Sequence, residues 1–195
     1  SDHGCRCRLG SDVSDPESGT SVLTLVHVSG ASTAPAIEEG KISVDISIQD
    51  KADFPFVLYG TLDYSSGQES ISDKFVPFNF ATSVMKVNCT GLESEGSVEK
   101  AVIYGMNTRC ELSLSGDKAP VANGSVPGEI TRTAGFSSSD QRLVFMVAVV
   151  KSDSNSSRTI KAARGGKEYA ADFTAAGITP GESYNGVFVL KLVDS

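Results

Sequence analysis

Residues 158–173 read RTIKAARGGKEYAADF, and this stretch gives the clearest indication of the fold. Two consecutive glycines, Gly165 and Gly166, separate two candidate strands at 158–164 and 167–173. Glycine accepts the positive φ angles that the two central residues of a tight hairpin turn adopt. The stretch therefore predicts two antiparallel strands that are joined by a two-residue turn.

Candidate strands recur at short intervals from Thr20 to the end of the chain. In KISVDISIQ, residues 41–49, the apolar residues from Ile42 to Ile48 fall on one face and polar residues fall on the other. Alternation with a period of two is typical of a half-buried strand. The further candidate strands are residues 20–28, 55–62, 73–80, 83–90, 97–104, 109–115, 128–133 and 183–193.

The most apolar segment is RLVFMVAVV, residues 142–150. It is apolar on both faces, so we expect it in the interior of a sheet that is covered on each side. The pairs Asn123-Gly124 and Pro180-Gly181 are expected turn positions, because these residue types favour turns.

No window shows the apolar spacing of an amphipathic helix longer than two turns. Many strands without helical crossovers are typical of a sandwich. We therefore expect an all-β protein, a single antiparallel β-sandwich over residues 20–195. Residues 1–19 have no periodicity and are expected to form a flexible tail.

The composition excludes several classes of protein. The net charge is −7 at pH 7, and nucleic acids require a cationic surface, so no nucleic-acid partner is expected. No apolar run approaches the roughly 20 residues that a membrane helix needs. The two histidines are His3 and His27, and no Gly-x-Ser-x-Gly nucleophile motif occurs. We therefore expect a protein that is not an enzyme and that uses no cofactor.

The four cysteines leave two alternatives open. Cys5 and Cys7 are too close in sequence for a relaxed mutual bridge. Cys89 and Cys110 lie on predicted strands that could be neighbours, so they form either a disulfide or two buried free thiols. His3, Cys5 and Cys7 could bind copper or zinc, but a closed site needs a fourth ligand. We therefore assign no metal site.

Two sets of side chains on the predicted strands could bind ligands. The first is basic and forms either an anion-binding patch or the charged edge of a hairpin that is protected against strand pairing. The second is aromatic and could make the protein a carbohydrate-binding surface module, although the sequence has no tryptophan. The basic set is Lys151, Arg158, Lys161, Arg164 and Lys167, and the aromatic set is Tyr59, Tyr64, Tyr104, Tyr169 and Tyr184.

The segment DKFVPFNFATSVMKVN, residues 73–88, resembles sequences of the fimbrillin-like family of Bacteroidales surface proteins. In that family an apolar strand passes through a joint of small residues into a strand that carries a lysine between apolar positions. VEKAVIY, residues 98–104, resembles the family's next core strand. The segments 167–169, 177–184 and 187–192 resemble the end of such a domain.

The resemblance covers roughly residues 40–193. It implies a transthyretin-like β-sandwich that is exported as a lipoprotein to the bacterial cell surface, outer membrane or pilus. The implied role is structural or adhesive, as an anchor, tip or accessory component of a type V pilus. Its implied partners are other pilus subunits or surface ligands, and its contact with a membrane is only through an N-terminal lipid.

The N-terminal tail carries the residues that this resemblance implicates in anchoring and processing. Cys5 is the candidate for lipid attachment, and Arg8 is the candidate for cleavage by an arginine-directed protease. Cleavage there removes no apolar strand, because the first candidate strand begins near Thr20. We therefore expect a monomer when the protein is isolated, and the alternative is that the tail is an unprocessed linker.

Overall fold

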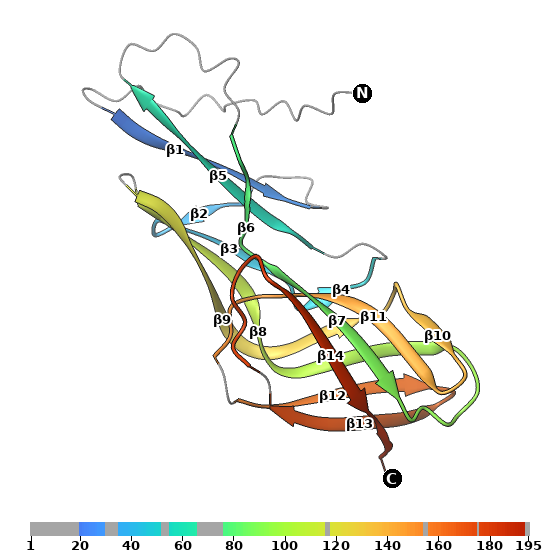
Figure 1. Cartoon of the computed structure of the whole chain (residues 1–195). Coiled ribbons are helices and arrows are strands. Elements are labelled where there is room, and N and C mark those ends of the chain that lie inside the picture. Colours follow the sequence, from blue (N-terminus) through green and yellow to red (C-terminus); the bar gives the residue numbers. More distant parts are fainter. Residues whose placement is uncertain are drawn as a thin grey trace, which may run out of the picture.

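The computed structural model describes residues 20–29, 35–51, 55–65, 76–115, 118–153, 156–174 and 176–193. All regular secondary structure in these ranges is β-strand, so the predicted all-β fold is confirmed. The strands form sheets of eight, four and three strands, and most pairs are antiparallel (Figure 1). Within these ranges, no helix is long and apolar enough to cross a membrane.

The eight-stranded sheet contains the hairpin that the sequence predicted. β12 (Ser157–Arg164) pairs with β13 (Lys167–Thr174), and Gly165 and Gly166 join them with φ angles of 58° and 71°. The path through this sheet is β15 (Lys191–Leu192), β13, β12, β8 (Val98–Ser115), β3 (Lys41–Asp45) and β2 (Ile37–Glu38). Off this path, β9 (Lys118–Arg132) pairs with β8, and β4 (Ile48–Gln49) pairs in parallel with β9.

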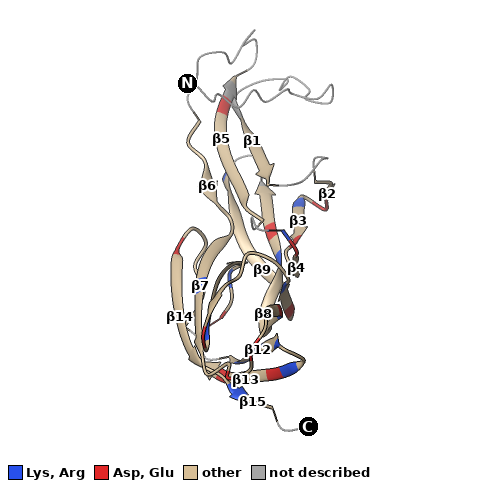
Figure 2. Cartoon of the chain, turned by 90° about the vertical axis from the view of Figure 1, so that its right-hand side faces the viewer, with Lys and Arg blue, Asp and Glu red and all other residues tan. Residues whose placement is uncertain are grey.

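The four-stranded sheet packs against part of the eight-stranded sheet and completes a sandwich. Figure 2 shows the two layers, with β7 and β14 on one side and β8 and β12 on the other. β14 pairs with β7 in parallel, which the expectation of an antiparallel sandwich did not include. The strand order is β10 (Ser137–Ser139), β11 (Arg142–Val149), β7 (Ser83–Thr90) and β14 (Ser183–Val189).

The hydrophobic core consists of side chains at alternate positions of the facing strands. Burial of this apolar surface is the main favourable contribution to folding. The core includes Met85, Val87 and Cys89 of β7, Leu143, Phe145, Val147 and Val149 of β11, and Ile160 and Ala162 of β12.

A third, three-stranded sheet lies at one end of the molecule, above the sandwich in the view of Figure 1. β1 (Thr20–Val28) pairs with β5 (Val57–Ser65) along its whole length, and β5 also pairs with β6 (Asn79–Phe80). The first strand is therefore paired outside the two sheets of the sandwich.

The predicted strand at residues 41–49 is interrupted in the structure. The backbone N–H of Ser47 donates a 2.8 Å hydrogen bond to Oδ1 of Asp45, a local side-chain bond that bends the chain. As a result, Ile46 is fully buried whereas Ile48 is 70% exposed. The expectation that all four apolar residues share one face is therefore wrong for Ile48.

The predicted turn at Asn123-Gly124 is also wrong, because both residues lie within β9. Gly124 is needed there for a different reason. A Cβ atom at this position would lie 2.0 Å from the carbonyl oxygen of Lys151, so only glycine allows the two backbones to approach.

β11 lies between β10 and β7, as expected for the apolar segment 142–150. Its inward residue Val147 is fully buried, but Met146 on the outer face is 45% exposed. The expectation that this strand is covered on both faces is therefore wrong at Met146. The reason is that the eight-stranded sheet covers only one face of the smaller sheet.

Gln49 covers the part of β11 that extends beyond the end of β10. Its Nε2 donates to the carbonyl oxygen of Ala148 at 2.9 Å, and the N–H of Ala148 donates to its Oε1 at 3.0 Å. Gln49 is 2% exposed and also donates from Nε2 to the carbonyl oxygen of Ile46 at 3.1 Å. The side-chain amide thus satisfies backbone groups of β11 where β10 has ended.

Candidate functional site

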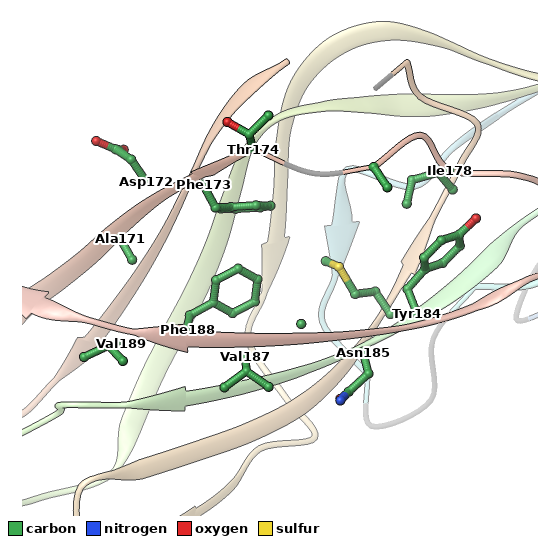
Figure 3. Close-up of a pocket in the computed structure, with 13 residues that line it drawn as sticks. Ala171, Asp172, Phe173, Thr174, Ile178, Tyr184, Asn185, Val187, Phe188 and Val189 are labelled. Carbon is green, nitrogen blue, oxygen red and sulfur yellow. The ribbon is translucent and has the colours of Figure 1, made fainter. Parts of the chain in front are cut away.

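The sandwich is open along its other side, where β14 forms the edge of the smaller sheet. A cavity of about 450 Å³ lies between β13 and β14. Its lining comes from these two strands, from the segment between them and from Met85 of β7 (Figure 3).

Two phenylalanine rings form one wall of this cavity. Phe173 of β13 and Phe188 of β14 have ring centroids 4.8 Å apart and ring planes inclined at 60°. Aromatic pairs at such distances contribute stability beyond the area that they bury. The pair thus joins the two sheets at the back of the opening.

Gly186 allows the Phe188 ring to occupy this position. A Cβ atom at residue 186 would lie 2.5 Å from Cε2 of Phe188, so the ring would have to move to make room for it. The ring lies against the backbone of its own strand, and the absence of a side chain at Gly186 leaves space between Phe188 and Tyr184. Figure 3 shows the rings of Tyr184 and Phe188 on the same side of β14.

Hydrogen bonds fix the opposite wall of the cavity. The hydroxyl of Tyr184 accepts a 2.7 Å bond from the N–H of Thr179, and Oγ of Ser83 donates to the carbonyl oxygen of Thr179 at 2.7 Å. Ile178 is 5% exposed, and its N–H donates to the carbonyl oxygen of Ser152 at 2.9 Å. The segment between β13 and β14 is therefore held against the smaller sheet and against Ser152, which lies between β11 and β12.

The polar residues of the lining lie at the rim. Oδ1 of Asp172 accepts a 2.6 Å bond from the hydroxyl of Thr159, and Oδ1 of Asn185 accepts a 2.7 Å bond from Nδ2 of Asn88. Histidine, lysine, arginine and cysteine do not occur among the described residues of this lining. The arrangement suits the binding of an apolar group and offers no pairing of a nucleophile with a base.

The outer face of β14 is exposed and uncharged, and its second half is apolar. Val187 is 71% exposed and Val189 is 66% exposed, while Leu190, at the end of the strand, is 2% exposed. After Leu190 the chain joins the larger sheet, because β15 pairs with β13. The predicted strand 183–193 is therefore two strands that belong to different sheets.

The two cysteines of the predicted strands lie in the core. Cys89 is on β7 and Cys110 is on β8, and these strands belong to different sheets and do not pair with each other. Both are buried free thiols, the second of the two alternatives above. Burial raises the pKa of each thiol to about 12, and the nearby carboxylate of Glu111 adds to the effect at Cys110.

We expect these thiols to be unreactive until the protein unfolds. In a Cys5→Ser/Cys7→Ser variant, two thiols should react with a thiol reagent in denaturant without reductant, and neither should react quickly in buffer, because the thiolate is the reactive form. Stability should also fall as pH rises from about 9 towards 12, since only the unfolded thiols ionise in that range. A count of zero thiols in denaturant would instead demonstrate a disulfide.

The residues implicated in anchoring and processing, Cys5 and Arg8, lie outside the described residues, as do His3 and Cys7. Their roles therefore remain sequence-based predictions. The other histidine, His27, lies exposed on β1.

The five basic residues predicted on and around the hairpin do not form one patch. Arg158 and Arg164 point inward and are 2% and 7% exposed. Nε of Arg164 donates to the carbonyl oxygen of Gly96 at 2.9 Å. Lys161 on the outer face forms a 2.7 Å ion pair with Glu168. Successive side chains of β12 point to opposite faces of the sheet, so its basic residues do not share one face. Neither an anion-binding patch nor a charged hairpin edge therefore describes all five basic residues.

The tyrosines do not form an exposed row among the described residues. Tyr169 is 2% exposed, and its hydroxyl accepts a bond from the N–H of Ser94 at 2.9 Å. Tyr184 lines the cavity, and the ring of Tyr104 lies 5.8 Å from Nζ of Lys161 on the outer face. The side chain of Tyr64 is outside the described part of the structure.

Tyr184 is one of the five tyrosines that the sequence offers as candidates, whereas Phe173 and Phe188 are not among the predicted site residues. The signal for Tyr184 and Phe188 was the alternation in SYNGVFV, residues 183–189, in which aromatic residues flank a glycine on one face. That pattern does not reveal which strand faces them, because β13 and β14 are brought together only by the tertiary structure.

No protein-family model matches this sequence, and no curated protein is similar to it. Among the similar solved structures are two of candidate cell adhesion proteins from Bacteroides. The one from Bacteroides uniformis ATCC 8492 is 10% identical, with a TM-score of 0.54 over 89% of this chain and 71% of that chain. The one from Bacteroides ovatus ATCC 8483 is 12% identical, with a TM-score of 0.56 over 97% and 73%. At such low identity the similarity establishes one conclusion, that this chain has the fold of these two proteins.

Proposed function

We propose that this chain is a non-catalytic adhesive or structural protein of the bacterial cell surface, similar to a pilus anchor, tip or accessory component. The observation that carries the proposal is the apolar cavity between β13 and β14, which adjoins an exposed and uncharged strand. Such a site can hold an apolar group of a partner but supplies no acid–base pair for catalysis.

Two further observations support a surface role. The fold is shared with two proteins that are named as candidate cell adhesion proteins. The resemblance of residues 73–88 and 98–104 to fimbrillin-like sequences points in the same direction, and it is the basis for the proposed lipid at Cys5, processing at Arg8 and location at the outer membrane or pilus.

The proposal is tested with beads that carry the purified protein. We expect wild-type beads to adhere to whole Bacteroides cells or to epithelial monolayers more than albumin-coated beads do. In Ala171→Phe a large side chain fills the cavity between the sheets, and adhesion should fall about fivefold or more. In the matched control Ala170→Phe the ring is added on the other face of β13, so adhesion should stay unchanged.

Circular dichroism checks that both variants fold. Wild-type beads that adhere no better than albumin beads to either surface would overturn the adhesive function. Equal adhesion of the Ala171→Phe and Ala170→Phe beads would overturn the assignment of the cavity as the adhesive site.

A further inference from the structure

The free edge of β14 differs from the other edges of the two large sheets. β14 has seven residues, SYNGVFV, and none of them is charged or proline. β10 has only three residues, all serine, and β2, β4 and β15 have two residues each. The open side of β9, which β4 covers only at its end, carries charges and prolines, namely Lys118, Pro120, Pro127 and Glu129. Natural sheets protect their edges by short strands, charges or proline, so an unprotected edge of this length indicates a strand partner.

Among the described residues, the backbone groups of β14 on this side have no strand partner. The N–H of Leu190 donates to the carbonyl oxygen of Thr90 on β7 at 2.8 Å, and the carbonyl oxygen of Gly186 accepts a 3.3 Å bond from the Asn88 side chain. Even-numbered residues of β14 therefore direct their backbone groups towards β7. Because successive residues of a strand direct these groups to opposite edges, the odd-numbered residues direct theirs outward. In the described part of the chain, no strand pairs with β14 on that side.

We propose that two copies of this chain associate through β14, whose free edges pair antiparallel about a two-fold axis at Gly186. Gly186 is the middle residue of the strand, so this register pairs all seven residues. Asn185 then pairs with Val187 of the second copy, and Ser183 pairs with Val189. These are the odd-numbered positions whose backbone groups point outward, so each pair can exchange two hydrogen bonds.

The same register is complementary for side chains. On the inner face, Tyr184 of one copy lies opposite Phe188 of the other, and aromatic cross-strand pairs are favourable. These rings then lie beside the mouth of the neighbouring cavity. On the outer face, the pairing covers part of Val187 and Val189, which are 71% and 66% exposed in the single chain. No like charges are opposed, because the strand carries none.

The dimensions of the contact predict a weak dimer. Seven residues at about 3.3 Å each give a paired edge roughly 23 Å long. A contact along a single strand edge of this length buries less surface than the about 800 Å² per partner of a standard interface. The dimer therefore belongs to the transient class and should dissociate on dilution. The expectation of a monomer from the sequence considered only the N-terminal tail and not this edge.

Sedimentation equilibrium over a range of protein concentrations tests the proposal. We expect wild type to pass from monomer to dimer as its concentration rises. In Val187→Lys, and separately in Val187→Glu, like charges meet diagonally across the axis, so each dissociation constant should rise about tenfold or more. An equimolar mixture of the two variants should form heterodimers, because the opposed charges then attract.

Met146→Lys is the matched control. Met146 is also an exposed apolar residue on the outer face of the same sheet, but it lies two strands away from the free edge. This variant should dimerise as wild type does. A wild-type protein that stays monomeric at its highest soluble concentration would overturn the proposal. So would a dimer that Val187→Lys leaves intact, or a mixture of the charged variants that stays monomeric.

Discussion

Val147→Asp should abolish folding. Val147 is fully buried in the centre of β11, opposite Met85 of β7. A carboxylate at this position would be buried without a partner, at a cost of several kcal/mol or more, whereas a domain of this size has a total stability of about 5–15 kcal/mol. Circular dichroism and the yield of soluble protein measure the effect.

Met146→Asp provides the matched control for this prediction. Met146 is the adjacent residue of the same strand, but it points outward and is 45% exposed. The same carboxylate there stays hydrated, so this variant should fold with a loss of no more than about 1 kcal/mol. A soluble Val147→Asp protein that unfolds cooperatively near the wild-type midpoint would show that β11 is not a core strand.

Gln49→Met should have the second largest effect. Methionine has nearly the same length and volume as glutamine, so the packing changes little, but it cannot make the three hydrogen bonds of the buried amide. The N–H and carbonyl groups of Ala148 and the carbonyl of Ile46 lose these partners. At about 1–3 kcal/mol for each unsatisfied buried group, we expect a loss of roughly 3–5 kcal/mol.

Urea denaturation measures this loss as a shift of the midpoint. Gln141→Met is the control, because Gln141 is exposed in the turn before β11. A midpoint of Gln49→Met equal to that of Gln141→Met would mean that the Gln49 amide does not hold the β11 edge. The contact between Gln49 and Ala148 would then contribute little to the stability of β11.

The two sides of the four-stranded sheet differ in how their outer backbone groups are hydrogen-bonded. On the β10 side, where β10 has ended, the side chain of Gln49 supplies the hydrogen bonds to β11 that a longer β10 would make. At β14 the described structure contains no such substitute, and an apolar cavity adjoins the free backbone. The proposed dimer contact therefore uses the edge that no side chain covers in the described structure.

The sequence by itself determined the strands that are marked by a turn motif or by a regular alternation of apolar and polar residues. The Gly165-Gly166 turn, the strand 83–90 and the strand 20–28 were predicted with the bounds or geometry that the structure has. Turn chemistry and alternation depend on neighbours in the chain, and they can therefore be recognised without the fold.

Apart from the β12–β13 hairpin, only the tertiary structure decided which strands pair with each other and where the alternation of a segment fails. Ile48 fits the alternation of its segment but is exposed, because the bend at Asp45 and Ser47 turns it away. Gly124 appeared to mark a turn but permits a close approach by Lys151. The cavity depends on Phe173 and Phe188, which are distant enough in the chain that no local pattern joins them. Contacts of this kind are set by packing between sheets, and packing has no signature in the order of residues along one strand.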